Sequence, residues 1–134
     1  MIEEFTFHHL GILTPSLAES VERYVTTFHY TKKSPLLEIP KSAISVCCLE
    51  RSDAPRIELI QPHDPESPLS KRTASGGYHL AWSVPDIEVA IPRLEVEGYH
   101  AMSIFNSSLW EGARCVFLVS PQQELVELVE NPVS

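Results

Sequence analysis

Apolar residues along this chain recur at two spacings, one typical of half-buried strands and one typical of amphipathic helices. Residues 5–13 follow the strand spacing. A Ser–Glu capping box at Ser16 and Glu19 then opens an apolar stripe at helical spacing, which predicts a helix over residues 16–28. The stripe, expected to be buried, consists of Leu17, Val21, Tyr24 and Phe28. The other strands predicted in this half are about 30–38, 43–49 and 56–61, with turns at Pro40 and 52–55.

The second half of the chain repeats this order of elements. It begins with a predicted strand at 78–84, followed by a helix from Asp86 to about residue 97, with Gly98 as its stop. Pro92 lies inside that helix and should kink it or displace its first turn. The expected buried residues of this helix are Ile87, Ile91 and Leu94. The remaining predicted strands are 99–105, 113–119 and 124–129.

The repetition extends to individual residues. The segment from His9 to Leu17 matches the segment from His79 to Ile87 without a gap, and I-E-L-I at 57–60 matches V-E-L-V at 126–129. We therefore predict an α+β fold of two tandem βαβββ modules, at about 5–62 and 77–131, joined by a linker at 63–76. Each module would expose an apolar sheet face that it cannot bury alone. The modules should then pack into a single domain, 1–134, with a curved mixed sheet around a cleft.

The composition indicates what kind of protein this is and which partners it is not expected to bind. The chain is 43% hydrophobic and 21% charged, which is typical of a globular protein. Its net charge of -8 argues against nucleic acid or an anionic membrane as the main partner. The sequence has neither a positively charged signal region at its N-terminus nor an apolar run approaching about 18 residues. Three cysteines without metal-binding spacing fit a reducing cytosol, so we expect a cytoplasmic protein.

The duplicated positions include residues that can bind metal. Each half opens with a histidine on a predicted strand, His9 or His79, and closes with a glutamate between apolar residues, Glu58 or Glu127. A single pair has an ordinary explanation, since a strand histidine is usually a hydrogen-bonded core or surface residue. Recurrence in both halves favours metal ligands, because a buried carboxylate needs a partner. Two imidazoles and two carboxylates suit Co²⁺, Mn²⁺, Ni²⁺, Fe²⁺ or Zn²⁺, with coordination positions open to water or substrate.

The other histidines are weaker candidates. His8 precedes His9 on the same predicted strand and must point to the opposite face, so the repeat selects His9. The remaining three, which are expected to be solvated in turns or in the linker, are His29, His63 and His100.

The opening segments of the two halves, H-L-G-I and Y-H-L-A-W-S-V-P-D-I, resemble the vicinal-oxygen-chelate superfamily of glyoxalase I, extradiol dioxygenases, bleomycin-resistance proteins and methylmalonyl-CoA epimerase. The resemblance covers nearly the whole chain. The run I-E-L-I-Q-P followed by P-E-S-P-L-S-K is similar to the epimerase branch. The resemblance implies a divalent metal ion at His9, Glu58, His79 and Glu127. Such an ion chelates two vicinal oxygens of the substrate and stabilises an enolate-like intermediate.

The resemblance also implies catalytic residues. In the epimerases, two carboxylates move a proton across the faces of a carbon between a thioester and a carboxylate, and one of these bases corresponds to Glu127. The other follows a proline entering the third strand of the first module, where this chain has Lys41 after Pro40. A lysine is protonated at neutral pH unless it is desolvated, so Lys41 departs from the epimerase pattern. Glu38 is the alternative second base if the register slips.

These observations favour a metal-dependent epimerase- or isomerase-like enzyme acting on a small acid or an acyl-CoA thioester. A glyoxalase-like lyase would use the same four ligands and is the first alternative. The second is a metal-free small-molecule-binding protein of the bleomycin-resistance type, although such proteins typically lose the ligand residues that this chain keeps. An extradiol dioxygenase fits less well, because its iron uses two histidines and one carboxylate. Module pairing within one chain or between two chains, as in a homodimer, stays open.

Overall fold

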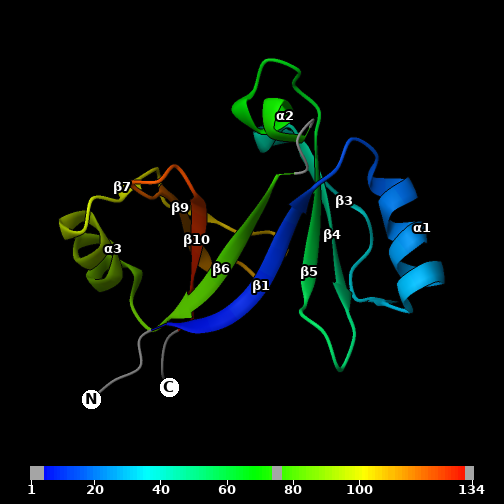
Figure 1. The fold of residues 1–134 in the computed structure, drawn as a ribbon, viewed down its shortest axis with the longest axis horizontal. Coiled ribbons are helices and arrows are strands. Elements are labelled where there is room, and N and C mark those ends of the chain that lie inside the picture. The colour runs from blue at the N-terminus through cyan, green and yellow to red at the C-terminus, as the bar shows by residue number, and fades with distance from the viewer. Residues whose placement is uncertain (1–4, 74–76, 132–134) are drawn as a thin grey trace. The chain divides into compact units, whose positions relative to one another are not determined.

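The structure is a computed structural model that describes residues 5–73 and 77–131. The chain divides into two compact units. Residues 9–78 form the first unit, and residues 79–134 with the chain up to His8 form the second. Strand β1 (Thr6–Leu13) therefore contributes residues to both units. Figure 1 labels the helices and strands of both units.

The first unit has the predicted βαβββ order. After β1 come α1 (Leu17–Phe28), β2 (Thr31–Lys32), β3 (Leu37–Ile39), a 3₁₀ turn η1 (Pro40–Ser42), β4 (Ile44–Glu50), β5 (Ile57–Pro62) and α2 (Pro68–Thr73). Strand β1 pairs with β5 in parallel, β4 pairs with β5 in antiparallel, and β2 and β3 both pair with β4. Helix α1 begins at the predicted cap, where the Ser16 side chain accepts a hydrogen bond from the amide of Glu19. It ends at His29, whose φ of 59° is left-handed.

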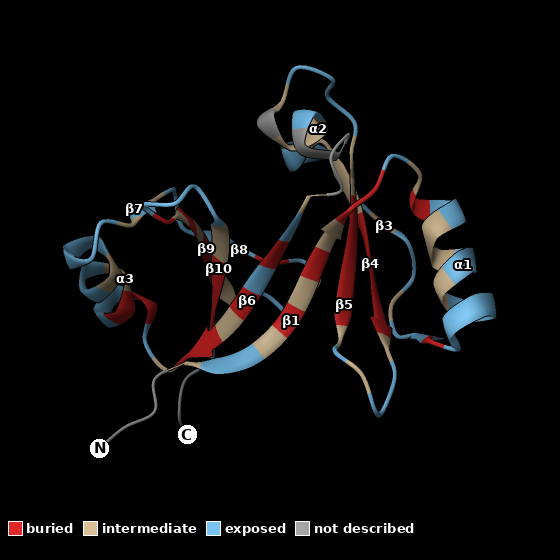
Figure 2. Ribbon diagram, viewed as in Figure 1, coloured by how far each residue is buried: buried red, intermediate tan, exposed pale blue. Residues whose placement is uncertain are grey.

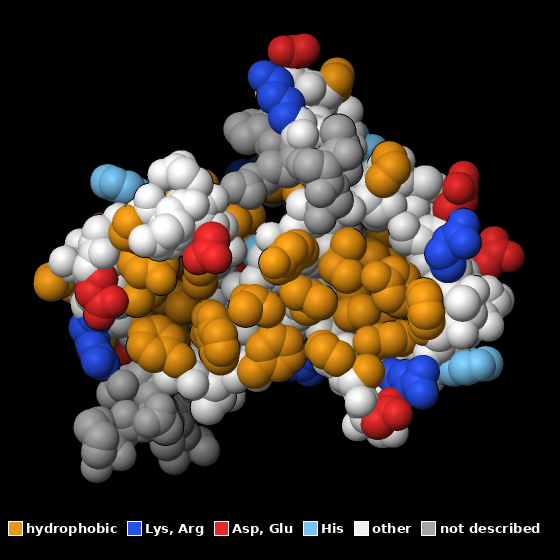
Figure 3. All heavy atoms as spheres, in the orientation of Figure 1, with side chains coloured by type: hydrophobic (Ala, Val, Ile, Leu, Met, Phe, Trp, Pro, Cys, Tyr) orange, Lys and Arg blue, Asp and Glu red, His pale blue; other side chains and the backbone are white. Residues whose placement is uncertain are grey.

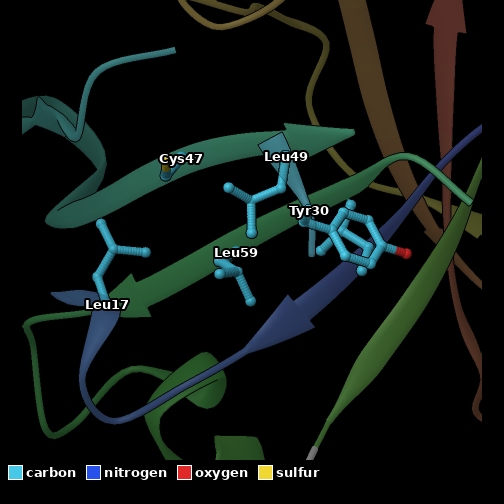
Figure 4. Close-up of a cluster of buried hydrophobic side chains, with 6 residues drawn as sticks. Leu17, Tyr30, Cys47, Leu49 and Leu59 are labelled. Carbon is cyan, nitrogen blue, oxygen red and sulfur yellow. The ribbon is translucent and has the colours of Figure 1, made fainter. Parts of the chain in front are cut away.

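The core of the first unit lies between α1 and one face of its sheet. Its buried residues are Leu17, Tyr30, Cys47, Leu49, Ile57 and Leu59. Figure 4 shows this cluster and labels Leu17, Tyr30, Cys47, Leu49 and Leu59. Val21 and Tyr24 pack against this cluster as predicted. Burial of such side chains contributes about 1.5–3 kcal/mol each and makes the helix side of the sheet a closed face.

The prediction that Phe28 is buried is wrong, because the residue is 48% exposed. It is the last residue of α1, and its ring packs on Tyr24 at 5.7 Å between centroids instead of entering the core. The apolar spacing therefore continues one helical turn beyond the part of the stripe that packs on the core.

The second unit has the same order of elements. They are β6 (Tyr78–Val84), α3 (Ile87–Val96), β7 (His100–Ala101), β8 (Phe105–Asn106), β9 (Arg114–Val119) and β10 (Leu125–Glu130). Strand β6 pairs with β10 in parallel, β10 pairs with β9 in antiparallel, and β7 and β8 pair with β9. Its buried core consists of Val84, Ile87, Ala90, Val116, Leu118 and Leu128. Figure 2 shows buried residues along β10 and the end of β6 that leads to α3. The α+β class and the repeated βαβββ order are confirmed.

The start of α3 is fixed to the sheet by a charged cluster. Glu130 accepts a hydrogen bond from the backbone amide of Ile87 and two from the Arg114 guanidinium, each at 2.9 Å. Arg114 also bonds Glu88 at 2.7 Å. The hydrogen bonds from Arg114 lower the pKa of the Glu130 carboxyl, which favours its ionised form at the positive end of the helix dipole. Asp86 caps the helix as predicted, which means that Pro92 does not displace its first turn.

Two predicted strands are interrupted in the structure. The segment predicted at 30–38 forms only β2 and β3, and the segment at 99–105 forms only β7 and the first residue of β8. Between β2 and β3, the Ser34 hydroxyl accepts the hydrogen bond that the Cys48 amide donates, and Pro35 has no amide to donate. A side chain thus replaces a backbone group in the ladder, and the strand stops.

Candidate metal centre

The first unit brings His9 and Glu58 together. Strands β1 and β5 pair in parallel with Gly11 opposite Glu58, and His9 lies two residues before Gly11. Since residues two apart on a strand share a face, both side chains point to the same side of the sheet. His9 Nε2 lies 3.0 Å from Glu58 Oε1, and the two residues are 0% and 8% exposed. This face is the one opposite to α1.

The second unit brings His79 and Glu127 together in the same way. Strands β6 and β10 pair in parallel with Ala81 opposite Glu127, which places His79 and Glu127 on one face. His79 Nε2 lies 3.1 Å from Glu127 Oε1, and both residues are 2% exposed. Each unit therefore holds one imidazole and one carboxylate, all four residues being buried and of metal-ligand type.

Burial explains why these pairs favour a cation. A buried carboxylate away from water is expensive unless a positive charge or hydrogen-bond donors compensate for it. In each pair a histidine nitrogen lies close to a glutamate oxygen, at 3.0 Å for His9 and Glu58 and at 3.1 Å for His79 and Glu127. A divalent ion is satisfied by imidazole nitrogen and carboxylate oxygen together, so the donor chemistry of both pairs fits such an ion.

The neighbours of the two pairs differ. Cys48 on β4 stands opposite Glu58, and burial raises the pKa of its thiol to about 11. The thiol is therefore neutral near pH 7 and is a small apolar neighbour rather than a thiolate ligand. Phe117 on β9 stands opposite Glu127, and its ring meets the His79 ring edge to face at 5.1 Å. Phe117 and Cys48 were not among the residues predicted from the sequence, although both positions follow from pairing the repeated strands in register.

The structure separates the other histidines from these pairs. The His8 ring lies 4.7 Å from that of Trp110 and meets it edge to face. His63, expected to be solvated, is exposed, but its Nε2 is 2.7 Å from the Ser45 hydroxyl and so it has a side-chain partner.

The two candidate second bases lie in different places. Glu38 pairs with Ser45 on β4, which puts it on the face that α1 covers and on the opposite side of the sheet from Glu58. Lys41 lies in the η1 turn that joins β3 to β4. Both residues are exposed.

Two βαβββ units, each with a buried His–Glu pair on adjacent parallel strands, define a fold of the vicinal-oxygen-chelate type. The sequence profile of the Glyoxalase/Bleomycin resistance protein/Dioxygenase superfamily matches residues 8–127, and the chain belongs to this superfamily. The predicted resemblance is thereby confirmed.

Named relatives of the chain include an epimerase. The mitochondrial methylmalonyl-CoA epimerase of Dictyostelium discoideum is 31% identical over 131 residues, which cover 92% of this chain and 77% of that protein.

Solved structures share the fold. Hypothetical protein BH1468 of Bacillus halodurans C-125 superposes with a TM-score of 0.81 at 24% identity over 98% of both chains. A Streptomyces coelicolor methylmalonyl-CoA epimerase variant in complex with 2-nitronate-propionyl-CoA gives a TM-score of 0.79 at 22% identity over 96% of both chains.

Among residues 5–73 and 77–131, no helix has the length and apolar character needed to cross a bilayer.

Proposed function

We propose that the protein is a metal-dependent epimerase of an acyl-CoA thioester that carries a second carboxylate, with methylmalonyl-CoA as the reference substrate. The observation that carries this proposal is the occurrence of the same buried His–Glu pair in both units. The 31% identity to an epimerase and the fold shared with an epimerase bound to an acyl-CoA analogue support it. Together, His9, Glu58, His79 and Glu127 hold one divalent ion, of Co, Mn, Ni, Zn or Fe.

The ion, when bound, supplies a Lewis acid that stabilises an enolate oxygen. The proton transfers belong to residues of the chain. Glu127 removes the proton from the carbon between the thioester and the carboxylate, in a setting from which burial excludes water. The residue that protonates the other face is Lys41. Glu38 is the weaker choice, because the register of β3 on β4 turns it to the α1 side of the sheet.

Metal content and hydrogen exchange test the proposal together. Elemental analysis of purified protein should find about one divalent ion per chain. His9→Ala and His79→Ala should abolish binding, whereas His8→Ala, a matched change at the neighbouring histidine of β1, should leave it intact. A protein that takes up none of these ions would overturn the metal site and leave the small-molecule-binding alternative.

The chemical step is followed with methylmalonyl-CoA in D₂O. Glu127→Gln should slow deuterium incorporation at the acidic carbon by about 10² or more, the usual scale for loss of a general base. Lys41→Ala should lose epimerisation, while Glu38→Gln should keep it. Metal-loaded protein that exchanges neither this thioester nor malonyl thioesters with larger substituents would refute the epimerase reaction and favour the glyoxalase-like lyase.

We propose further that two copies of the chain form a homodimer. Phe7 and Leu80 are exposed, Phe7 contacts Trp82 at 6.1 Å, and a second copy would cover this apolar surface. Apolar side chains at the surface are drawn in Figure 3. Sedimentation velocity should give twice the 15.0 kDa chain mass, and Leu80→Lys should reduce it to the monomer. A wild-type monomer at all concentrations would refute this assembly.

A further inference from the structure

The two units hold the same metal-ligand pair but surround it with different side chains. Opposite Glu58 is Cys48, and the strand beyond it carries Leu37, which pairs with Val46. Opposite Glu127 is Phe117, and the strand beyond it carries Phe105, which pairs with Cys115. Small and aliphatic groups in the first unit are thus replaced by two aromatic rings in the second.

The rings of His79, Phe117 and Phe105 contact one another in that order. His79 and Phe117 meet edge to face, with centroids 5.1 Å apart and planes at 88°. Phe117 and Phe105 lie nearly parallel, 5.7 Å apart at 17°. Offset-parallel and edge-to-face arrangements at these separations are the favourable geometries for aromatic pairs. The stack therefore has a defined orientation relative to the metal-ligand pair.

Register places one more apolar side chain beside the rings. The amide of Met102 donates to the carbonyl of Phe117 at 2.8 Å, which continues the pairing of His100 with Val119 and Ala101 with Leu118. Met102 is thus opposite Phe117 and on the same face. We call Met102, Phe105 and Phe117 the aromatic shelf.

The aromatic shelf is open on its outer side. Phe105 is 38% exposed and Met102 is 52% exposed, although both lie on the face that carries the buried His79 and Glu127. Exposed apolar side chains on the same face as a buried polar pair are typical of a ligand-binding surface, in which few polar groups fix an apolar ligand.

We infer that the aromatic shelf binds the substituent on the carbon that Glu127 deprotonates, and that this substituent is a bulky alkyl or aryl group rather than methyl. The inference rests on the proposed function and specifies its substrate class. Two stacked rings and a thioether offer a flat and adaptable apolar contact, which a methyl group would leave largely uncovered. The aliphatic neighbours of Glu58 offer no such platform, so the substituent faces the second unit.

Binding of substituted malonates tests this inference without requiring turnover. Malonate, methylmalonate, phenylmalonate and benzylmalonate present the same two carboxylates and differ only in the substituent. Isothermal titration of the Co²⁺-loaded protein should show phenylmalonate or benzylmalonate binding about tenfold more tightly than methylmalonate. Phe105→Ala should abolish that preference while leaving the affinity for malonate and the metal content unchanged.

Phe28→Ala is the matched control, since Phe28 is also an exposed phenylalanine, at 48% against 38% for Phe105, and lies on α1 in the other unit. It should leave the preference intact. Phe105→Leu keeps an apolar side chain but removes the ring, and it provides the same comparison if Phe105→Ala unfolds.

Equal affinities of the wild-type protein for all four malonates, or an undiminished preference in the Phe105 variants, would overturn the inference and leave the epimerase proposal standing. Failure of the metal-loaded protein to bind any malonate would instead count against the proposed function itself.

Discussion

Removing the divalent ion that we propose for this protein should lower its melting temperature by about 10 °C. The ligands of each pair are far apart in sequence, 48 residues for His79 and Glu127, so the unfolded chain has no preformed site. An ion that binds only the folded state, present at a hundredfold excess over its Kd, adds about 2.7 kcal/mol to the free energy of unfolding. Each kcal/mol raises the melting temperature of a chain of this size by roughly 4 °C, which gives the expected shift.

Differential scanning fluorimetry with chelator, followed by titration of Co²⁺, Mn²⁺, Ni²⁺ or Zn²⁺, measures this shift. His79→Gln should lose the response to metal, and it should also melt lower without metal, since Glu127 is buried and loses its imidazole partner. Loss of a partner to a buried acceptor costs about 1–3 kcal/mol. His63→Gln, a change at an exposed histidine, should respond as the wild type does. A wild-type melting temperature indifferent to both chelator and added ions would refute the reasoning.

Two further predictions concern the α1 core of the first unit and the Arg114–Glu130 ion pair of the second. Leu17→Ala should lower the free energy of unfolding by about 2–5 kcal/mol, because Leu17 is buried in the α1 core. Phe28→Ala should lower it by under about 1 kcal/mol, because Phe28 is exposed. Urea denaturation compares the two variants, and equal losses would contradict this packing. Arg114 lowers the pKa of Glu130, so the resulting stability is present above the ordinary carboxyl pKa of 4.5 and is lost as the pH falls through the lower folded value. Arg114→Met should therefore lower the urea midpoint at neutral pH and have less effect near pH 3, and an equal loss at both pH values would argue against this ion pair.

Much of the fold could be predicted because its signals are local. Ser16 and Asp86 both cap the helices that they were expected to cap, since a side-chain oxygen accepting an amide two or three residues ahead is a short-range interaction. Strand β6 has its predicted bounds, 78–84. The interrupted strands could not be predicted in the same way. The hydrogen bond from Cys48 to the Ser34 side chain joins residues 14 positions apart, and no alternation pattern records it.

The candidate site was only partly accessible from sequence for a related reason. The repeat identified His9, Glu58, His79 and Glu127 as equivalent positions, but equivalence does not show which histidine meets which glutamate. That depends on the parallel pairing of β1 with β5 and of β6 with β10. Glu38 illustrates the converse. It lies near the position expected for a base in the sequence, yet the register of β3 turns it to the other face of the sheet.

The two units are alike in the His–Glu pair and differ in the residues around it. Parallel pairing of the first and last strand of each unit is enough to build a His–Glu pair, and both units do so with nearly equal distances of 3.0 and 3.1 Å. The residue opposite each glutamate is free to differ without disturbing that pair, as Cys48 and Phe117 do. The two pairs are alike in their residue types, whereas a substrate that loses a proton from one face needs an asymmetric environment. In this chain the asymmetry comes from the strands that flank the ligands, and the aromatic shelf is its largest element.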